Sequence, residues 1–65
     1  MEDDMIEFTF KIFGKTFADV LGEEKRLFNS LSEAQGEAGN MINQRPEIME
    51  IRITAPDGYT SIVNL

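Results

Sequence analysis

Acidic side chains are the most numerous groups that could do chemistry in this chain of 65 residues, which has 12 Asp and Glu and no His. General acid–base catalysis can use two neighbouring carboxylates, and Glu33 and Glu37 are spaced to lie one turn apart on a helix. A pair of this kind on the outer face of a helix is usually solvated. Nucleophilic catalysis also lacks its commonest base, histidine. We therefore predict a protein that is not an enzyme and that binds no cofactor.

Two further motifs have the composition of a ligand site without its full pattern. Residues 14–16, Gly-Lys-Thr, match the end of a phosphate-binding loop, but Thr9 stands where that pattern requires a glycine. Residues 2–4, Glu-Asp-Asp, could attract a cation, but no glycine turn and no returning acidic ligand follow them. The absence of Cys and His excludes zinc sites built from these ligands. We predict a hairpin turn at the first motif, a flexible acidic tail over residues 1–4, and no metal site.

The formal net charge of −6 at pH 7 limits the class of partner. It would repel phosphate backbones and anionic membrane surfaces, so we predict neither direct nucleic-acid binding nor membrane binding. No apolar run approaches the roughly 20 residues of a membrane-spanning helix, and the acidic start lacks the positive and apolar regions of a signal peptide. These features predict a cytoplasmic protein whose partner is another protein, either basic or itself a nucleic-acid-binding protein.

The clearest structural signal lies at the end of the chain, where residues 47–65 predict a β-hairpin. Pro56, Asp57 and Gly58 suit successive positions of a type I turn that is followed by a left-handed residue. This turn places Ala55 opposite Tyr59 and fixes the register. The predicted pairs are Met49–Leu65, Ile51–Val63 and Ile53–Ser61 on an inward, mostly apolar face, and Glu50–Asn64, Arg52–Ile62 and Thr54–Thr60 on an outward, mostly polar face.

Two strands are also predicted near the start of the chain. Residues 5–13 alternate as a half-buried strand does, with one side formed by Ile6, Phe8, Phe10 and Ile12. Glycine at the first central position suits a two-residue type II′ turn at residues 14–15. A second strand over residues 16–21 would then run back along the first, with Asp19 opposite Phe10.

A charged connection, residues 22–26, leads to a helix that is predicted from about Leu31 to Gln44. Ser30 and Glu33 form a capping box at its start, and Pro46 stops it. Apolar residues at helical spacing make one face of this helix amphipathic: Leu31, Ala34, Ala38, Met41 and Ile42.

Together the elements predict a single α+β domain over residues 5–65, with the order ββαββ and one helix packed on one face of a small antiparallel sheet. The competing prediction is βαββ, in which the helical pattern begins at Phe17 and either continues as one helix of about 28 residues or breaks at Gly22. The long helix would contain Gly22, Gly36 and Gly39, each of which costs about 1 kcal/mol relative to Ala. We therefore favour ββαββ.

A stripe of small side chains is the least ordinary feature of the predicted helix. Ser32, Gly36, Gly39 and Asn43 share one side, where another backbone could come close. The alternative reading is a weak helix that packing holds in place. Ile48 and Ile62, beside Thr54 and Thr60 on the outward hairpin face, offer a second possible surface. Four carboxylates could also occupy a basic cleft of a partner by mimicking the charge of nucleic acid: Glu23, Glu24, Glu33 and Glu37.

These features predict a small acidic protein-binding module that regulates or inhibits a larger macromolecule by docking on it. Its size and composition are also common among phage and mobile-element products. The alternative prediction is a structural subunit that self-associates into a homo-oligomer, such as a homodimer, through the glycine stripe or a sheet edge.

Overall fold

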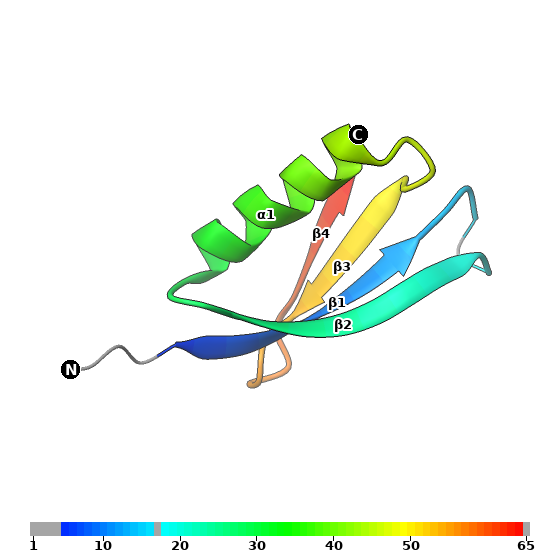
Figure 1. The fold of residues 1–65 in the computed structure, drawn as a ribbon. Coiled ribbons are helices and arrows are strands. Elements are labelled where there is room, and N and C mark those ends of the chain that lie inside the picture. The colour runs from blue at the N-terminus through cyan, green and yellow to red at the C-terminus, as the bar shows by residue number, and fades with distance from the viewer. Residues whose placement is uncertain (1–4, 17, 65) are drawn as a thin grey trace.

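The computed structural model describes residues 5–16 and 18–64, which form two β-hairpins joined by a helix (Figure 1). The elements are β1 (Ile6–Phe13), β2 (Val20–Phe28), α1 (Leu31–Gln44), β3 (Glu50–Thr54) and β4 (Thr60–Asn64). The four strands form one antiparallel sheet in the order β2-β1-β3-β4, and α1 packs on one face. The α+β class and the ββαββ order are confirmed, and βαββ is wrong. The tail predicted over residues 1–4 lies outside the described residues.

The second hairpin has the predicted turn and register. Gly58 adopts a left-handed φ of 95°, and its N–H donates to the Ala55 carbonyl over 2.9 Å. The Ala55 N–H donates to the Tyr59 carbonyl over 2.8 Å, which places these two residues opposite each other. Every predicted pair within residues 50–64 is observed. The pair of Met49 with Leu65 lies outside the described residues.

The start of β3 differs from the prediction. The strand begins at Glu50 and not at residue 47, because the chain first makes a turn in which the Ile48 N–H donates to the Arg45 carbonyl over 3.0 Å. This turn carries Ile48 into the core, where it is fully buried, so its prediction on the outward face is wrong. Met49, predicted to point inward, is 44% exposed.

The first hairpin differs more strongly. The predicted second strand exists and pairs with β1, but its bounds of 16–21 are wrong: β2 covers Val20–Phe28. Residues 22–26 therefore belong to a strand and not to a connection. Phe10 lies opposite Glu24 and not Asp19. A longer turn replaces the predicted one, because the Gly14 N–H donates to the Asp19 carbonyl over 2.7 Å. The register shifts between Ile12 and Phe13, which leaves an extra residue in β2 as a β-bulge.

The helix begins and ends as predicted. Ser30 is its N-cap, and the hydroxyl accepts a hydrogen bond from the Glu33 N–H over 3.3 Å. The Glu33 carboxylate reaches back to the N–H of Asn29 over 3.0 Å, one residue earlier than a capping box requires. At the other end the Arg45 N–H donates to the Met41 carbonyl over 2.9 Å.

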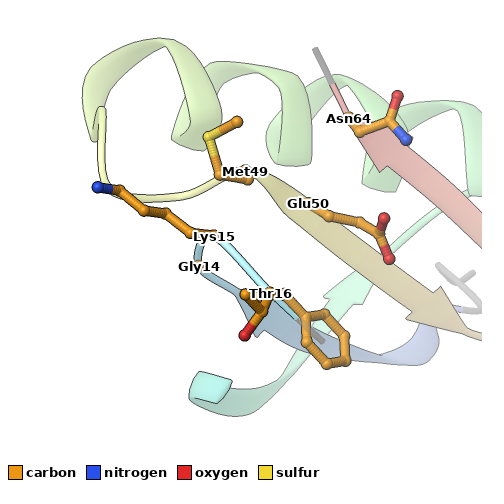
Figure 2. Close-up of a pocket in the computed structure, with 7 residues that line it drawn as sticks. Gly14, Lys15, Thr16, Met49, Glu50 and Asn64 are labelled. Atoms are coloured by element: carbon orange, nitrogen blue, oxygen red, sulfur yellow. The ribbon is translucent and has the colours of Figure 1, made fainter. Parts of the chain in front are cut away.

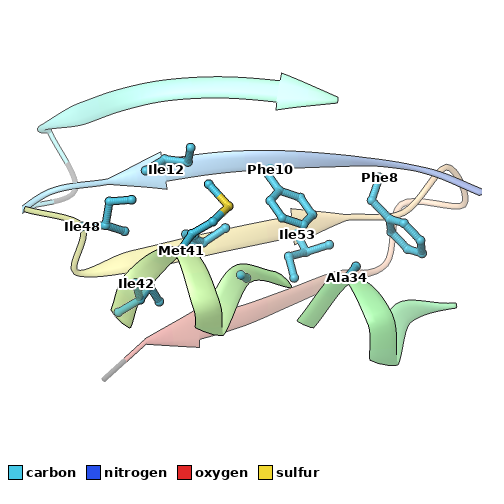
Figure 3. Packing of buried hydrophobic residues seen from close by; sticks show 10 residues of the cluster. Phe8, Phe10, Ile12, Ala34, Met41, Ile42, Ile48 and Ile53 are labelled. Atoms are coloured by element: carbon cyan, nitrogen blue, oxygen red, sulfur yellow. The ribbon is translucent and has the colours of Figure 1, made fainter. Parts of the chain in front are cut away.

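The core lies between α1 and the sheet (Figure 3). The helix supplies two alanines, a methionine and an isoleucine to it, and β1, β3 and the turn before β3 supply phenylalanines and isoleucines: Ala34, Ala38, Met41, Ile42, Phe8, Phe10, Ile12, Ile48, Ile51 and Ile53. No residue of β2 is fully buried. Its Phe28 is half-buried and stacks on Phe10 with 5.6 Å between the ring centroids. Strand β2 is therefore a sheet edge that the core only partly covers.

Within residues 5–16 and 18–64, the only helix is too short and too polar to span a membrane.

Candidate functional site

The predicted stripe on α1 lies on its solvent side. Ser32, Gly36 and Asn43 are exposed, and Gly39 is partly exposed. A Cβ atom added to Gly36 or Gly39 would have no neighbour within 4 Å among the described residues. The stripe is therefore brought together as predicted, and its glycines are not needed for close packing within the described chain.

The four predicted carboxylates do not form one acidic surface. Glu24 on β2 and Glu37 on α1 both bind the Arg26 guanidinium, with 2.7 Å between Arg26 Nη1 and Glu37 Oε2. These partners raise the pKa of Arg26, most strongly through the hydrogen bond that Arg26 donates to Glu24. Because successive side chains of a strand point to opposite faces, Glu23 lies on the other face of the sheet from Glu24. Glu33 accepts a hydrogen bond at the helix start.

Polar side chains of the helix contact both edge strands, β2 and β4. On one side Glu37 meets Arg26 of β2. On the other side the Gln35 amide donates to the Ser61 hydroxyl of β4 over 2.8 Å. Both contacts are at least partly exposed, so each contributes at most about 1 kcal/mol, and together they favour one position of the helix on the sheet.

The helix-free face of the sheet is mostly polar, and Phe13, the last residue of β1, is buried on it. Phe13 is only 4% exposed, and Arg52 and Lys11 lie over its ring at 5.0 and 5.8 Å from the ring centroid. The Arg52 guanidinium also binds the Glu50 carboxylate over 2.8 Å. The predicted alternation of this strand did not assign Phe13 to either face. Its odd position places it on the face away from the core. Ile62 on this face is 55% exposed, as predicted for an outward residue.

A hollow of about 300 Å³ lies beside the turn between β1 and β2 (Figure 2). The Lys15 ammonium and the Glu50 carboxylate point to opposite ends of it, so no set of charged groups converges there. Its lining comes from the turn and from the adjoining ends of three strands: Phe13, Gly14, Lys15, Thr16, Met49, Glu50 and Asn64. Phe17 and Leu65, next in sequence to this lining, lie outside the described residues. We therefore assign no ligand to this hollow.

A second hollow, of about 410 Å³, is an apolar groove at the other end of the sheet. It forms because β1 pairs with β3 only from Thr9 onwards, opposite Thr54, after which the chain turns away at Ala55. Residues 6–8 of β1 therefore pair with β2 alone. The groove is lined by side chains from β1, the start of α1 and the β3–β4 turn: Ile6, Phe8, Leu31, Ala55, Pro56, Asp57 and Tyr59.

The rim of this apolar groove is exposed and carries one described carboxylate, that of Asp57. Tyr59 is 58% exposed and Ile6 is 38% exposed, whereas Phe8 at the base is buried at the end of the core (Figure 3). Asp57 is the charged member of the described lining, and one of its carboxylate oxygens accepts a hydrogen bond from the Tyr59 N–H over 3.0 Å. Sequence reasoning placed Ile6, Phe8 and Leu31 in the apolar interior and did not foresee a groove between them.

Among the described residues, no three Asp, Glu, His or Cys side chains gather in a way that could hold a metal ion. Comparison with protein-family models, with curated proteins and with solved structures finds no match.

Proposed function

We propose that this chain is a non-catalytic protein-binding module that docks on a larger partner in the cytoplasm and regulates or inhibits it. The apolar groove carries this proposal. It combines a buried aromatic base, Phe8, with an exposed rim that contains Ile6 and Tyr59. Anchoring side chains at protein interfaces fill hollows of this kind, and tyrosine is enriched around them.

The charge around the groove selects the partner's chemistry. Asp57 lies in the lining, and the whole chain has a formal net charge of −6 at pH 7. No Lys or Arg is part of the described lining. A complementary partner presents an apolar side chain next to Lys or Arg, and the attraction between unlike charges speeds its association.

The groove favours recognition over catalysis because it is open to water. An active site usually excludes water and holds titratable groups against the substrate. The described lining of this groove has two titratable groups, the Asp57 carboxylate and the Tyr59 hydroxyl. This groove therefore offers apolar surface to a bound group and not a means of proton transfer.

Paired surface variants test the proposal. We would immobilise the wild type, the double variant Ile6→Thr/Tyr59→Ser and the control Ile62→Thr, and then capture proteins from a lysate of the source cells. Ile62 is 55% exposed on the helix-free face, so its variant removes a similar apolar side chain away from the groove. We expect the same bound proteins with the wild type and the control, and their loss with the double variant, while circular dichroism shows all three folded. Retention of those proteins by the folded double variant would overturn docking through the groove.

A further inference from the structure

Strand β2 is an open edge of the sheet over nine residues, Val20–Phe28. The direction of its backbone groups follows from the ladder, since successive residues of a strand turn their N–H and C=O to alternate sides. The Ala55 N–H points to β4, so the N–H and C=O groups of Thr54 point to β1. The backbone groups of its partner Thr9 then point to β3, and those of Phe10 point to β2.

The same alternation reaches β2. Glu24, opposite Phe10, turns its backbone towards β1. Glu23, Lys25 and Leu27 therefore turn their N–H and C=O groups to the open edge. These groups can hydrogen-bond to a further strand without any change in the fold, because no strand of the described chain lies on that side.

We propose that the open edge of β2 pairs antiparallel with the β2 strand of a second copy of this chain. The sequence of residues 21–27, Leu-Gly-Glu-Glu-Lys-Arg-Leu, is self-complementary about Glu24. In that register Glu23 of each copy lies opposite the partner's Lys25, and Leu27 lies opposite the partner's Leu21. An interface with two-fold symmetry contains each of these contacts twice.

The helix-free face of this pairing gains both kinds of contact. Glu23 and Lys25 both project from it, so their cross-strand pairs join opposite charges at short range. Leu27 is 57% exposed, and Leu21, at the bulge, is 39% exposed. Pairing would cover the exposed parts of both leucines.

The helix side of the pairing is also compatible with a second copy. The two Glu24 side chains meet at the axis, and each already binds the Arg26 of its own chain. Arg26 would lie opposite the partner's Gly22, where a Cβ atom would have no neighbour within 4 Å in the described chain. This space lets Arg26 reach diagonally towards the partner's Glu24 as well, so the two carboxylates at the axis are flanked by two guanidinium groups.

Charge balance further favours this edge. Residues 22–27 contain two acidic and two basic side chains, in a chain whose formal net charge is −6. Two copies therefore approach each other here with less repulsion than the whole chain would produce. The helix lies back from this edge (Figure 1), so the two helices would sit on the same face of one continuous sheet without meeting. None of the residues that line the apolar groove belongs to β2, so self-pairing does not depend on the proposed docking function.

A charge-swap series tests the register. We would measure self-association by sedimentation equilibrium for the wild type, Glu23→Lys, Lys25→Glu, and the double variant Glu23→Lys/Lys25→Glu. Each single variant places like charges opposite each other twice, so we expect dimer dissociation constants raised roughly tenfold. The double variant exchanges the two charges and restores opposite-charge pairs, so its dissociation constant should return to near the wild-type value. Both side chains are exposed, so the monomer folds in every variant.

A matched control is Thr60→Lys, which changes the charge on the other edge strand, β4. It should leave the dissociation constant unchanged. A wild type that stays monomeric up to about 1 mM would overturn the proposal. So would single variants that associate like the wild type, or a double variant that fails to recover. A loss of association in Thr60→Lys equal to that in Glu23→Lys would overturn it as well, since the contact would then run through β4.

Discussion

Replacement of the two helical glycines by alanine should stabilise this protein. Gly36 and Gly39 lie inside α1, on its solvent side, and neither has a positive φ. Glycine in a helix loses more backbone freedom on folding than alanine does, which costs about 1 kcal/mol at each position. A steric penalty would offset this gain only if the new methyl groups met other atoms.

No such penalty is expected, because a Cβ atom at either position has no neighbour within 4 Å in the described chain. The double variant Gly36→Ala/Gly39→Ala should therefore raise the free energy of unfolding by about 2 kcal/mol. For a domain of this size, that gain corresponds to a rise of roughly 8–16 °C in the melting temperature. The change is large relative to the total stability of a small domain.

Urea denaturation followed by circular dichroism at 222 nm measures this gain, with Gly58→Ala as the matched control. Gly58 has a φ of +95°, so its replacement forces alanine into a left-handed conformation although there is open space around it. The control should lose roughly 1 kcal/mol of stability. A double variant no more stable than the wild type would refute the reasoning.

The same double variant tests the glycine stripe as an interface. If Ser32, Gly36, Gly39 and Asn43 contact a partner or a second copy, the added methyl groups should keep the other backbone away and weaken association. If binding runs through the apolar groove and the β2 edge, affinity and oligomeric state should not change. Equilibrium binding measured with the stabilised variant decides between these outcomes.

Two further predictions concern the ends of α1. Ser30→Ala removes the hydroxyl that caps the Glu33 N–H and should lower the free energy of unfolding by about 1 kcal/mol; equal urea midpoints for variant and wild type would contradict this. The pKa of Glu47 is held below its ordinary 4.5, first by its own backbone N–H and then by Arg45. Its contribution to stability is therefore present above the ordinary pKa and is lost as the pH falls through the lowered value. Carboxyl NMR titration should find this lowered pKa, and Arg45→Gln should restore only part of it; an ordinary value in the wild type would refute the assignment.

The second hairpin could be predicted from sequence because its determinants are local. Pro56 restricts its own φ, and Gly58 takes the left-handed conformation that the turn requires. Once the turn is fixed, each pair along the two strands follows by counting. The prediction was wrong only at the start of β3, where the turn that contains the Arg45–Ile48 hydrogen bond delays the strand to Glu50. That turn depends on where the helix ends in space, which residue alternation does not encode.

The first hairpin could not be predicted in the same way. Strand β2 is an edge whose side chains are at most half-buried, so its sequence needs no alternation of apolar and polar residues. Residues 22–26, a glycine followed by four charged residues, therefore resemble a connection. Its position is fixed by the long backbone ladder with β1, in which Ile6 lies opposite Phe28. Local glycine preference at residues 14–15 was a weaker determinant than this ladder.

The apolar groove was beyond prediction for a related reason. It arises where β1 extends past the end of β3, so it depends on the relative lengths of two strands that are distant in sequence. The alternation of β1 identifies Ile6 and Phe8 as inward residues but does not say that the helix and β3 leave Ile6 partly uncovered. Tyr59 gave no signal beyond its place in the turn. A groove of this kind is visible only after the strands are assembled.

The two proposed surfaces lie on different parts of one sheet, and this separation makes them independently testable. The groove uses β1, α1 and the β3–β4 turn, whereas self-pairing uses β2. A dimer formed through β2 would therefore carry two free grooves. A partner that presents two or more copies of its apolar anchor should then bind the dimer far more tightly than a single anchor does, because the second contact is intramolecular. Glu23→Lys should remove this gain and leave the affinity for a single anchor unchanged, whereas Tyr59→Ser should weaken both.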